Sequence, residues 1–219
     1  MLEKADAVEL ASFNEIGSHT VTHSRLLSLD DATVTRELLL SKRTLERYLD
    51  KPVVSFAYPY GRGDKRLERL VAAAGYSLAR SAVFGLPFAR ISNLFNVPVT
   101  FLDTPLTPRS RLYSTLLCLS AFSRFGVRAI PDLWKRNPGD AYDSMLATIR
   151  ILAQEMEEAG TEPAAKAFVV LMHARRIEKC AAYSKLEEIL ESLKEIAVIG
   201  PLKDILPIDG RPTNMGSSR

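Results

Sequence analysis

Histidine and cysteine are both scarce in this chain, with three and two residues among 219. The cysteines, Cys118 and Cys180, have no CxxC spacing. Their placement excludes a cysteine-rich zinc module and a disulfide-dense scaffold, and it predicts free buried thiols. No apolar run reaches the roughly 18 residues that a membrane-spanning helix needs. The N-terminal stretch is polar and acidic, unlike a signal peptide, so we expect a cytoplasmic location by default.

A strong excess of either charge is also missing, since the formal net charge is only +3. So slight a balance gives no reason to expect nucleic acid or another polyanion as a partner. The 47% hydrophobic and 25% charged fractions are ordinary for a soluble globular protein. The length suits one domain with a sizeable core. We expect that domain at residues 1–208 and a disordered tail at 209–219.

Two of the three histidines lie in one short stretch, His19 and His23, four residues apart. A helical turn at this point would place both side chains on one face, where two neutral imidazoles can share a metal ion. Spacing alone is a weak signal, because such a pair is more often exposed or capping. The third histidine, His173, closes the apolar run 167–172. The end of a buried strand is where α/β folds place their chemistry.

Apolar periodicity predicts strands that alternate with helices, which favours an α/β fold with a parallel sheet or barrel. Asp30 or Asp31 is expected to cap one helix and Asp64 another. We expect helices at 3–11, about 31–49, 64–74 and 183–193, and strands at 13–17, 52–57, 76–80, 95–101, 167–172 and 197–200.

Residues 105–160 break this rhythm, because two helices, about 109–125 and 142–159, replace a strand–helix pair. We interpret the segment as a helical insertion. Basic and apolar residues are both concentrated in 109–136, and a helix of this kind can lie on a membrane surface. The favoured alternative is that its apolar face packs on the rest of the fold while the arginines are solvated.

Three segments stand in a recognisable order: Glu15–Ser24 contains H-T-V-T-H-S, Phe56–Gly61 ends in P-Y-G, and Val170–His173 reads V-L-M-H. This ordered set resembles the polysaccharide deacetylases, the NodB-homology group of carbohydrate esterase family 4. Their second motif reads H-[ST]-x-x-H-[PS], their third ends in P-Y-G, and their fifth is a hydrophobic run closing in L-x-H. The resemblance spans residues 13–173. It implies a (β/α) barrel of the deacetylase type, incomplete at the N-terminus, with the helical insertion.

The resemblance also implies roles for individual residues. His19 and His23 correspond to metal ligands, most simply for zinc, with cobalt or nickel as alternatives. His173 corresponds to the general acid. Tyr58, Pro59, Tyr60 and Gly61 match the groove-lining motif, and the backbone N–H of Tyr60 would help to hold the oxyanion. A Y-P-Y-G sequence is also a common tight turn, whatever its function.

Two departures from the family pattern matter. Family members carry an arginine two residues before the third-motif proline, where this chain has Ala57. The first motif, an aspartate pair that supplies a metal ligand and the general base, has no match. Asp64 and Asp103 are the nearest substitutes, although Asp64 is better explained as a helix cap and Asp103 as a loop residue. We therefore expect an N-terminally incomplete chain with weak metal binding and little hydrolysis of its own.

Three functions follow from these observations. The first is a metal-dependent hydrolase that removes N-acetyl groups from a polysaccharide or glycolipid. The second is a non-catalytic relative that binds carbohydrate in the same groove. The third is an α/β protein of another kind, in which the histidines are structural.

Overall fold

The computed structural model describes residues 4–84, 91, 93–99, 101–102, 146, 149–150, 169–179, 181–196 and 199–205. The chain divides into two compact units. The first comprises Met1–Ala82, Ser92–Val97 and Gly200–Arg219, and the second comprises Val83–Ile91 and Pro98–Ile199. The tail predicted at 209–219 and the membrane-surface segment considered at 109–136 lie outside the described residues. So does the insertion predicted at 105–160, except for residues 146 and 149–150.

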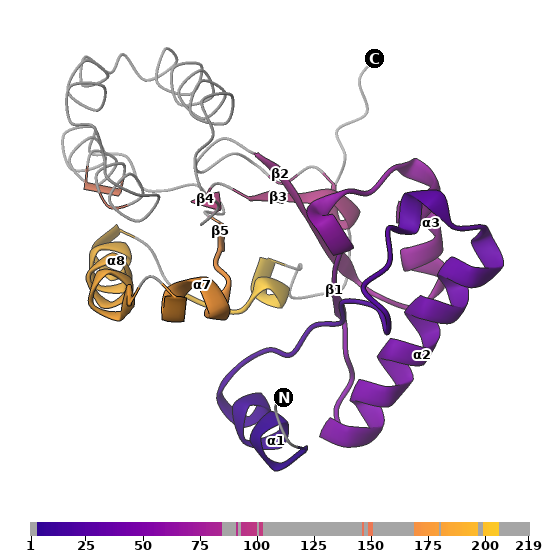
Figure 1. Ribbon diagram of the computed structural model, residues 1–219, viewed down its shortest axis with the longest axis horizontal. Coiled ribbons are helices and arrows are strands. Elements are labelled where there is room, and N and C mark those ends of the chain that lie inside the picture. The colour runs from indigo at the N-terminus through magenta and orange to yellow at the C-terminus, as the bar shows by residue number, and fades with distance from the viewer. Residues whose placement is uncertain are drawn as a thin grey trace. The chain divides into compact units, whose positions relative to one another are not determined.

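Helices and strands alternate through the N-terminal part of the chain. The longer elements are α1 (Lys4–Phe13), α2 (Asp31–Leu49), β1 (Ser55–Ala57), α3 (Lys65–Ala73), β2 (Leu78–Phe84) and β3 (Val97–Val99). Short 3-10 turns occur at η1 (Leu26–Ser28), η2 (Pro59–Gly61), η3 (Leu94–Asn96) and η4 (Leu202–Ile205). Helix α2 packs against both α1 and α3, as Figure 1 shows.

The two predicted helix starts are confirmed, because each has an aspartate at its N-cap. The carboxylate of Asp30 accepts from the Thr33 N–H at 2.9 Å, and that of Asp64 accepts from the Leu67 N–H at 2.8 Å. A capping carboxylate satisfies an N–H that has no partner within the helix. The hydrogen bonds from Thr33 also lower the pKa of the Asp30 carboxyl.

Parallel pairing confirms the α/β class. Strands β1, β2 and β3 form one sheet in that order. Strand β1 runs parallel to β2, with Phe56 opposite Ala79 and Ala57 opposite Arg80. On the other side of β1, Ser18 forms a parallel bridge with Phe56. Strands β1 and β2 thus form the parallel part of this sheet, which the segment around Ser18 extends beside β1.

The strand predicted at 13–17 was wrong. Helix α1 continues to Phe13, and in the segment that follows it only Ser18 pairs with the sheet. The other strands of this unit are present but shifted or shorter than predicted, since β1 begins only at Ser55 and β2 only at Leu78. A strand ends where its ladder partners end, and a local apolar pattern does not contain that information.

The core of the first unit lies between the sheet and its helices. Buried apolar side chains include Val34 and Leu38 of α2, Leu67 and Val71 of α3, and Phe56, Tyr58, Tyr76 and Ala79 from the sheet side. Full burial of a Val, Leu or Phe side chain contributes about 1.5–3 kcal/mol each. The apolar faces of α2 and α3 therefore hold the helices against the same face of the sheet.

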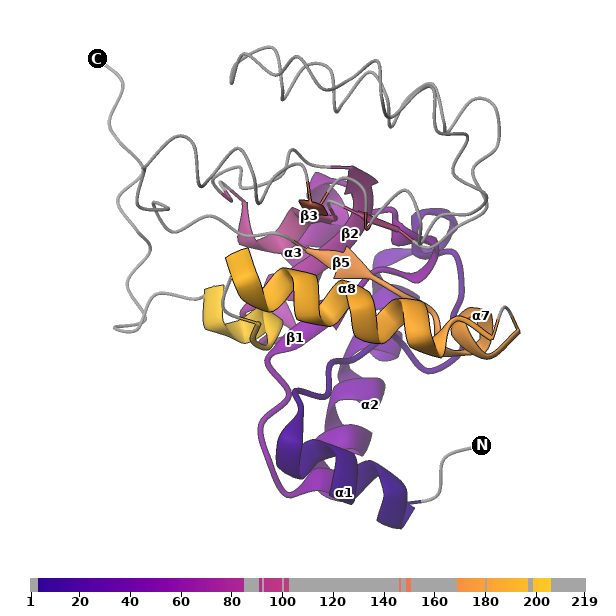
Figure 2. The same cartoon turned by 90° about the vertical axis from the view of Figure 1, so that its left-hand side faces the viewer.

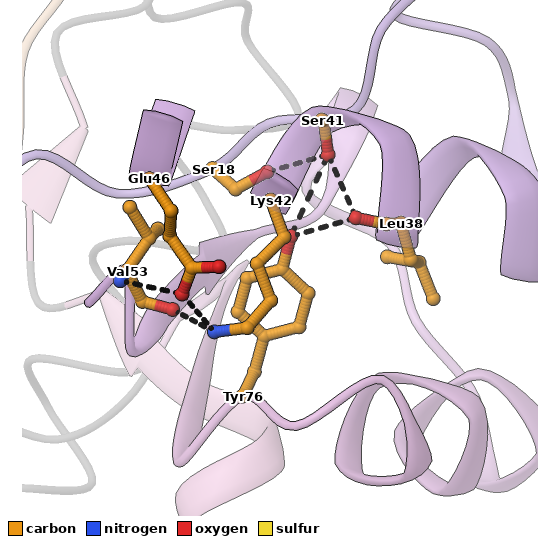
Figure 3. Close-up of polar contacts among 7 residues, drawn as sticks. All are labelled: Ser18, Leu38, Ser41, Lys42, Glu46, Val53 and Tyr76. Atoms are coloured by element: carbon orange, nitrogen blue, oxygen red, sulfur yellow. Dashed lines mark hydrogen bonds and ion pairs between the residues drawn. The ribbon is translucent and has the colours of Figure 1, made fainter. Parts of the chain in front are cut away.

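A small polar network crosses this core (Figure 3). Ser41 of α2 lies 2.7 Å from the Ser18 hydroxyl and donates to the Leu38 carbonyl at 3.0 Å. The Tyr76 hydroxyl also donates to the Leu38 carbonyl, at 3.0 Å. Close by, Lys42 contacts the Val53 carbonyl and pairs with a helix neighbour, Glu46. These contacts fix the segment that begins at Ser18 against α2.

The second unit contains β4 (Phe101–Leu102), β5 (Val170–Leu171), α7 (Ala174–Lys179) and α8 (Tyr183–Ile196). Strands β4 and β5 are parallel. Figure 2 shows α8 as the longer of the two helices, and its predicted start at Tyr183 is confirmed. Buried Ile177, Ile189 and Leu193 join α7 to α8.

The strand predicted at 197–200 is not seen at Ile199 or Gly200, and 197–198 lie outside the described residues.

Among the helices that the description covers in either unit, none is long and apolar enough to cross a membrane.

Candidate functional site

The His19–His23 segment is a loop and not the helical turn that the spacing allowed. Both Thr20 (φ 67°) and His23 (φ 56°) adopt left-handed backbone conformations, which a helix does not contain. The hydroxyl of Thr20 accepts from the His23 N–H at 3.1 Å. The two histidines therefore come together because the chain turns sharply between them.

The imidazole rings of His19 and His23 are close neighbours. Their centroids are 4.8 Å apart, with an edge-to-face angle of 72°. Nδ1 of His19 lies 2.6 Å from the carbonyl oxygen of Ala57. Because a carbonyl oxygen only accepts, Nδ1 carries the hydrogen, and in the neutral ring Nε2 is then the basic nitrogen. Metal-binding histidines are commonly oriented by such a bond to a backbone carbonyl.

Tyr60 is a second ring neighbour of His23. The two ring centroids are 4.8 Å apart at an angle of 61°, and the guanidinium carbon of Arg25 lies 4.4 Å from the Tyr60 ring centroid. A guanidinium over an aromatic face is attracted to the ring electrons. The chain thus brings His19, His23 and Tyr60 into one cluster, as the motifs predicted. It also places Arg25 over Tyr60, which the motifs did not predict.

The turn that carries Tyr60 is tightly constrained. Tyr60 has a left-handed backbone (φ 57°), and Gly61 follows at φ 69°. A Cβ on Gly61 would lie 2.1 Å from the Cβ of Ala82, so only glycine fits there. Tyr58, Pro59 and Gly61 are buried, whereas Tyr60 is 53% exposed. Of the four residues assigned to the groove, only Tyr60 presents its side chain to solvent.

Helix α2 anchors the histidine loop through Glu37, which the sequence analysis missed. One carboxylate oxygen, Oε2, accepts from the backbone N–H groups of both Val21 and Thr22 at 2.9 Å. Glu37 is only 8% exposed. The sequence does place a charged residue on the apolar side of an amphipathic helix. The role of that residue can be recognised only when its hydrogen-bond partners are known.

Arg80 is a second residue that the motifs did not identify. Ser18, Phe56 and Ala79 are paired across three adjacent segments. The next residues along them are His19, Ala57 and Arg80. Side chains alternate between the faces of a sheet, so Ala57 and Arg80 point to the face opposite the α2 core. Burial lowers the pKa of the Arg80 guanidinium, which still remains charged near neutrality.

A third metal ligand is not identified. Over the described part of the chain, no group of three or more His, Cys, Asp and Glu side chains could hold a metal ion. The Asp64 carboxylate is engaged as a helix cap, and Asp103 lies outside the described residues. His173 is exposed between β5 and α7 in the second unit. Its convergence with His19 and Tyr60 stays a prediction.

Comparison with known solved proteins gives several weak likenesses. The polysaccharide deacetylase BC0361 from Bacillus cereus is 25% identical, with 44% of this chain and 31% of that protein aligned at a TM-score of 0.39. The Streptococcus pyogenes deacetylase PplD is 22% identical, with 52% and 50% aligned at a TM-score of 0.42. BA3943 from Bacillus anthracis, described as a CE4 family pseudoenzyme, is 13% identical, with 93% and 50% aligned at a TM-score of 0.47. The alignments therefore span half of those proteins or less.

The family itself is indicated by sequence. Residues 4–79 match the family model for polysaccharide deacetylase, and this range contains the histidine loop and the Tyr60 turn. No curated protein sequence matches the chain. This match confirms the resemblance to the polysaccharide deacetylase family that the second and third motifs indicated, over residues 4–79.

Proposed function

We propose that the chain provides the site of a metal-dependent hydrolase that removes N-acetyl groups from a polysaccharide or glycolipid. His19 and His23 hold the divalent metal in this proposal, with zinc as the first choice and cobalt or nickel as alternatives. The substrate is an N-acetylated glycan, since the family acts on acetylated polysaccharides. Nothing in the modest net charge calls for a nucleic acid.

The observation that carries the proposal is the 2.6 Å contact between His19 Nδ1 and the Ala57 carbonyl. It sets the tautomer in which Nε2 has the lone pair, as a metal ligand requires. The His23 ring stands beside it at 4.8 Å. Two oriented imidazoles suit zinc chemically, although a catalytic zinc usually has three protein ligands, so we expect modest affinity.

The residues of the chain have distinct parts in the proposed reaction. When bound, the metal lowers the pKa of a coordinated water and polarises the acetyl carbonyl. The Tyr60 backbone N–H donates to the oxygen that becomes negatively charged. His173 gives a proton to the leaving amine, as a general acid does. The general base is assigned to no residue.

In this proposal, Arg80 takes the role of the arginine that the third motif of this chain lacks. In the family that arginine precedes the proline by two residues, where this chain has Ala57. Arg80 is the residue paired with Ala57 on the next parallel strand, and its side chain leaves the sheet on the same face. A guanidinium there can orient a carboxylate in the site through two parallel hydrogen bonds.

A non-catalytic carbohydrate-binding protein is the second candidate. The observation that favours it is that no third His, Cys, Asp or Glu joins the two histidines within the described ranges. The exposed Tyr60 ring, with Arg25 over one face, would then serve as a sugar-binding surface without hydrolysis.

Metal titration and acetate release separate the candidates. The purified chain is titrated with Zn²⁺ and Co²⁺ by calorimetry, and N-acetylated chito-oligosaccharide is incubated with the loaded protein. Metal binding with acetate release supports the hydrolase. Binding of the oligosaccharide without acetate release supports the non-catalytic relative. Absence of both metal and oligosaccharide binding would overturn the family-based function and leave the histidines structural.

A further inference from the structure

One buried carboxylate holds the loop that brings the two histidines together. Glu37 of α2 accepts the N–H groups of Val21 and Thr22 on a single oxygen, each at 2.9 Å. These two residues lie directly between Thr20 and His23, the loop positions with left-handed backbone. The contact therefore acts on the centre of the histidine loop.

This geometry restricts the loop more than a single hydrogen bond would. Each peptide unit is planar, so fixing two successive N–H vectors toward one oxygen fixes two successive peptide planes. The left-handed backbone of Thr20 is costly for a β-branched residue, and it persists only when its surroundings impose it. Glu37 is the described side chain that accepts from the peptide groups between the two strained residues.

We infer that Glu37 is a positioning residue for the histidine pair: it holds the 20–23 loop in the conformation that places the His23 ring beside His19 and Tyr60. The functional part of this inference rests on the proposed metal site. Glu37 acts through the backbone and is 8% exposed, so it is assigned no contact with substrate. Groups that orient the ligands of a metal change its affinity by about 10- to 100-fold.

Helix α2 offers a matched control for a purely structural role. Glu46 lies on the same helix and also accepts a backbone N–H, that of Val53 at 3.1 Å, while pairing with Lys42. Its contacts brace the chain before β1 and do not involve the histidine loop. Both glutamates contribute to folding in this way, but only Glu37 is expected to affect the imidazole pair.

The test uses Glu37→Met, Glu37→Gln and Glu46→Met in the full chain. Methionine keeps the length of the side chain but removes the acceptor, whereas glutamine keeps a carbonyl that can accept both N–H groups. NMR measures exchange of the Val21 and Thr22 amides and the ring contacts of His19 with His23. Calorimetry measures the Co²⁺ and Zn²⁺ affinities, and urea unfolding measures stability.

We expect Glu37→Met to expose both amides, remove the ring contacts and weaken metal binding by about 10- to 100-fold. Glu37→Gln should keep most of the amide protection, the ring contacts and the metal affinity. Glu46→Met should lower only the stability. If Glu37→Met keeps the ring contacts and matches Glu46→Met in every readout, the inference is overturned. If the unmodified chain binds neither metal but Glu37→Met still removes the ring contacts, the inference stands and the metal proposal fails.

Discussion

Ala57 and Arg80 face each other across adjacent parallel strands, so their side chains leave the sheet on the same face. His19 is attached to that strand through the Ala57 carbonyl. The Arg80 guanidinium is largely buried, and we propose that it acts in the site.

Arg80→Met is expected to lower acetate release by about 100-fold, the scale of a general base that is no longer oriented. The metal affinity should change by less than about twofold, because Arg80 is not a ligand in this proposal. Acetate is quantified enzymatically and the metal affinity by calorimetry. Arg69→Met, at an exposed position on α3, is the control and should alter neither value. Equal activity in the two variants would remove Arg80 from the site.

The histidines should separate into two functional classes. His19→Ala removes a proposed ligand and should weaken Co²⁺ binding by at least about 100-fold, more than a change in a supporting residue does. His173→Ala should keep the Co²⁺ affinity and lose about 100-fold or more of the acetate release, as expected for a proton donor. The visible absorption of bound Co²⁺ reports the first property. Loss of that signal in His173→Ala would show that His173 is itself a ligand.

Gly61 and Gly75 form a matched pair for the Tyr60 turn. Both have positive φ, but a Cβ on Gly61 would meet Ala82 at 2.1 Å, whereas on Gly75 the nearest atom is Lys42 Cε at 3.8 Å. Gly75→Ala should therefore cost only the conformational strain, about 1 kcal/mol. Gly61→Ala should cost several times more, roughly 3 kcal/mol or above, because it also overpacks a strand. Urea unfolding measures both, and equal costs would contradict the packing in the turn.

Alkaline pH should destabilise the first unit through its two buried tyrosines. Burial raises the pKa of Tyr58, and the nearby Glu68 and Asp64 raise it further; burial also raises the pKa of Tyr76. A phenol with a folded pKa above its unfolded value of about 10 stabilises the fold fully at lower pH. That stabilisation is lost as the pH rises past the unfolded value, because the unfolded state releases the proton first.

The corresponding measurement is urea unfolding from about pH 8 to pH 11. Tyr76→Phe should lower the stability at neutral pH, since the bond to the Leu38 carbonyl is lost, yet flatten the decline in alkali. Tyr48→Phe, at an exposed position, should leave the slope unchanged. If Tyr76→Phe does not reduce the decline of stability with pH, groups other than Tyr76 cause that decline.

The sequence predicted local features well and long-range ones poorly. The starts of α2 and α3 were predicted because an aspartate and an amphipathic run specify a helix start locally. The bounds of β1 were not, because a strand ends with its partners. The pairing of His19 with His23 was expected for the wrong reason, since left-handed residues between them, not a helix, bring the rings together. Glu37 and Arg80 were missed because their roles depend on partners 15 to 23 positions away in the sequence.

The left-handed Thr20 has a consequence for engineering. A β-branched residue in that conformation opposes folding, so selection for heat resistance alone would favour glycine or asparagine at this position. Either residue would keep the left-handed turn with less strain, but glycine would remove the side-chain oxygen that accepts from the His23 N–H. Variants of this chain ranked only by thermal tolerance would therefore include glycine variants in which His23 has lost one of its backbone contacts, an instance of the conflict between stability of the whole and orientation at the site.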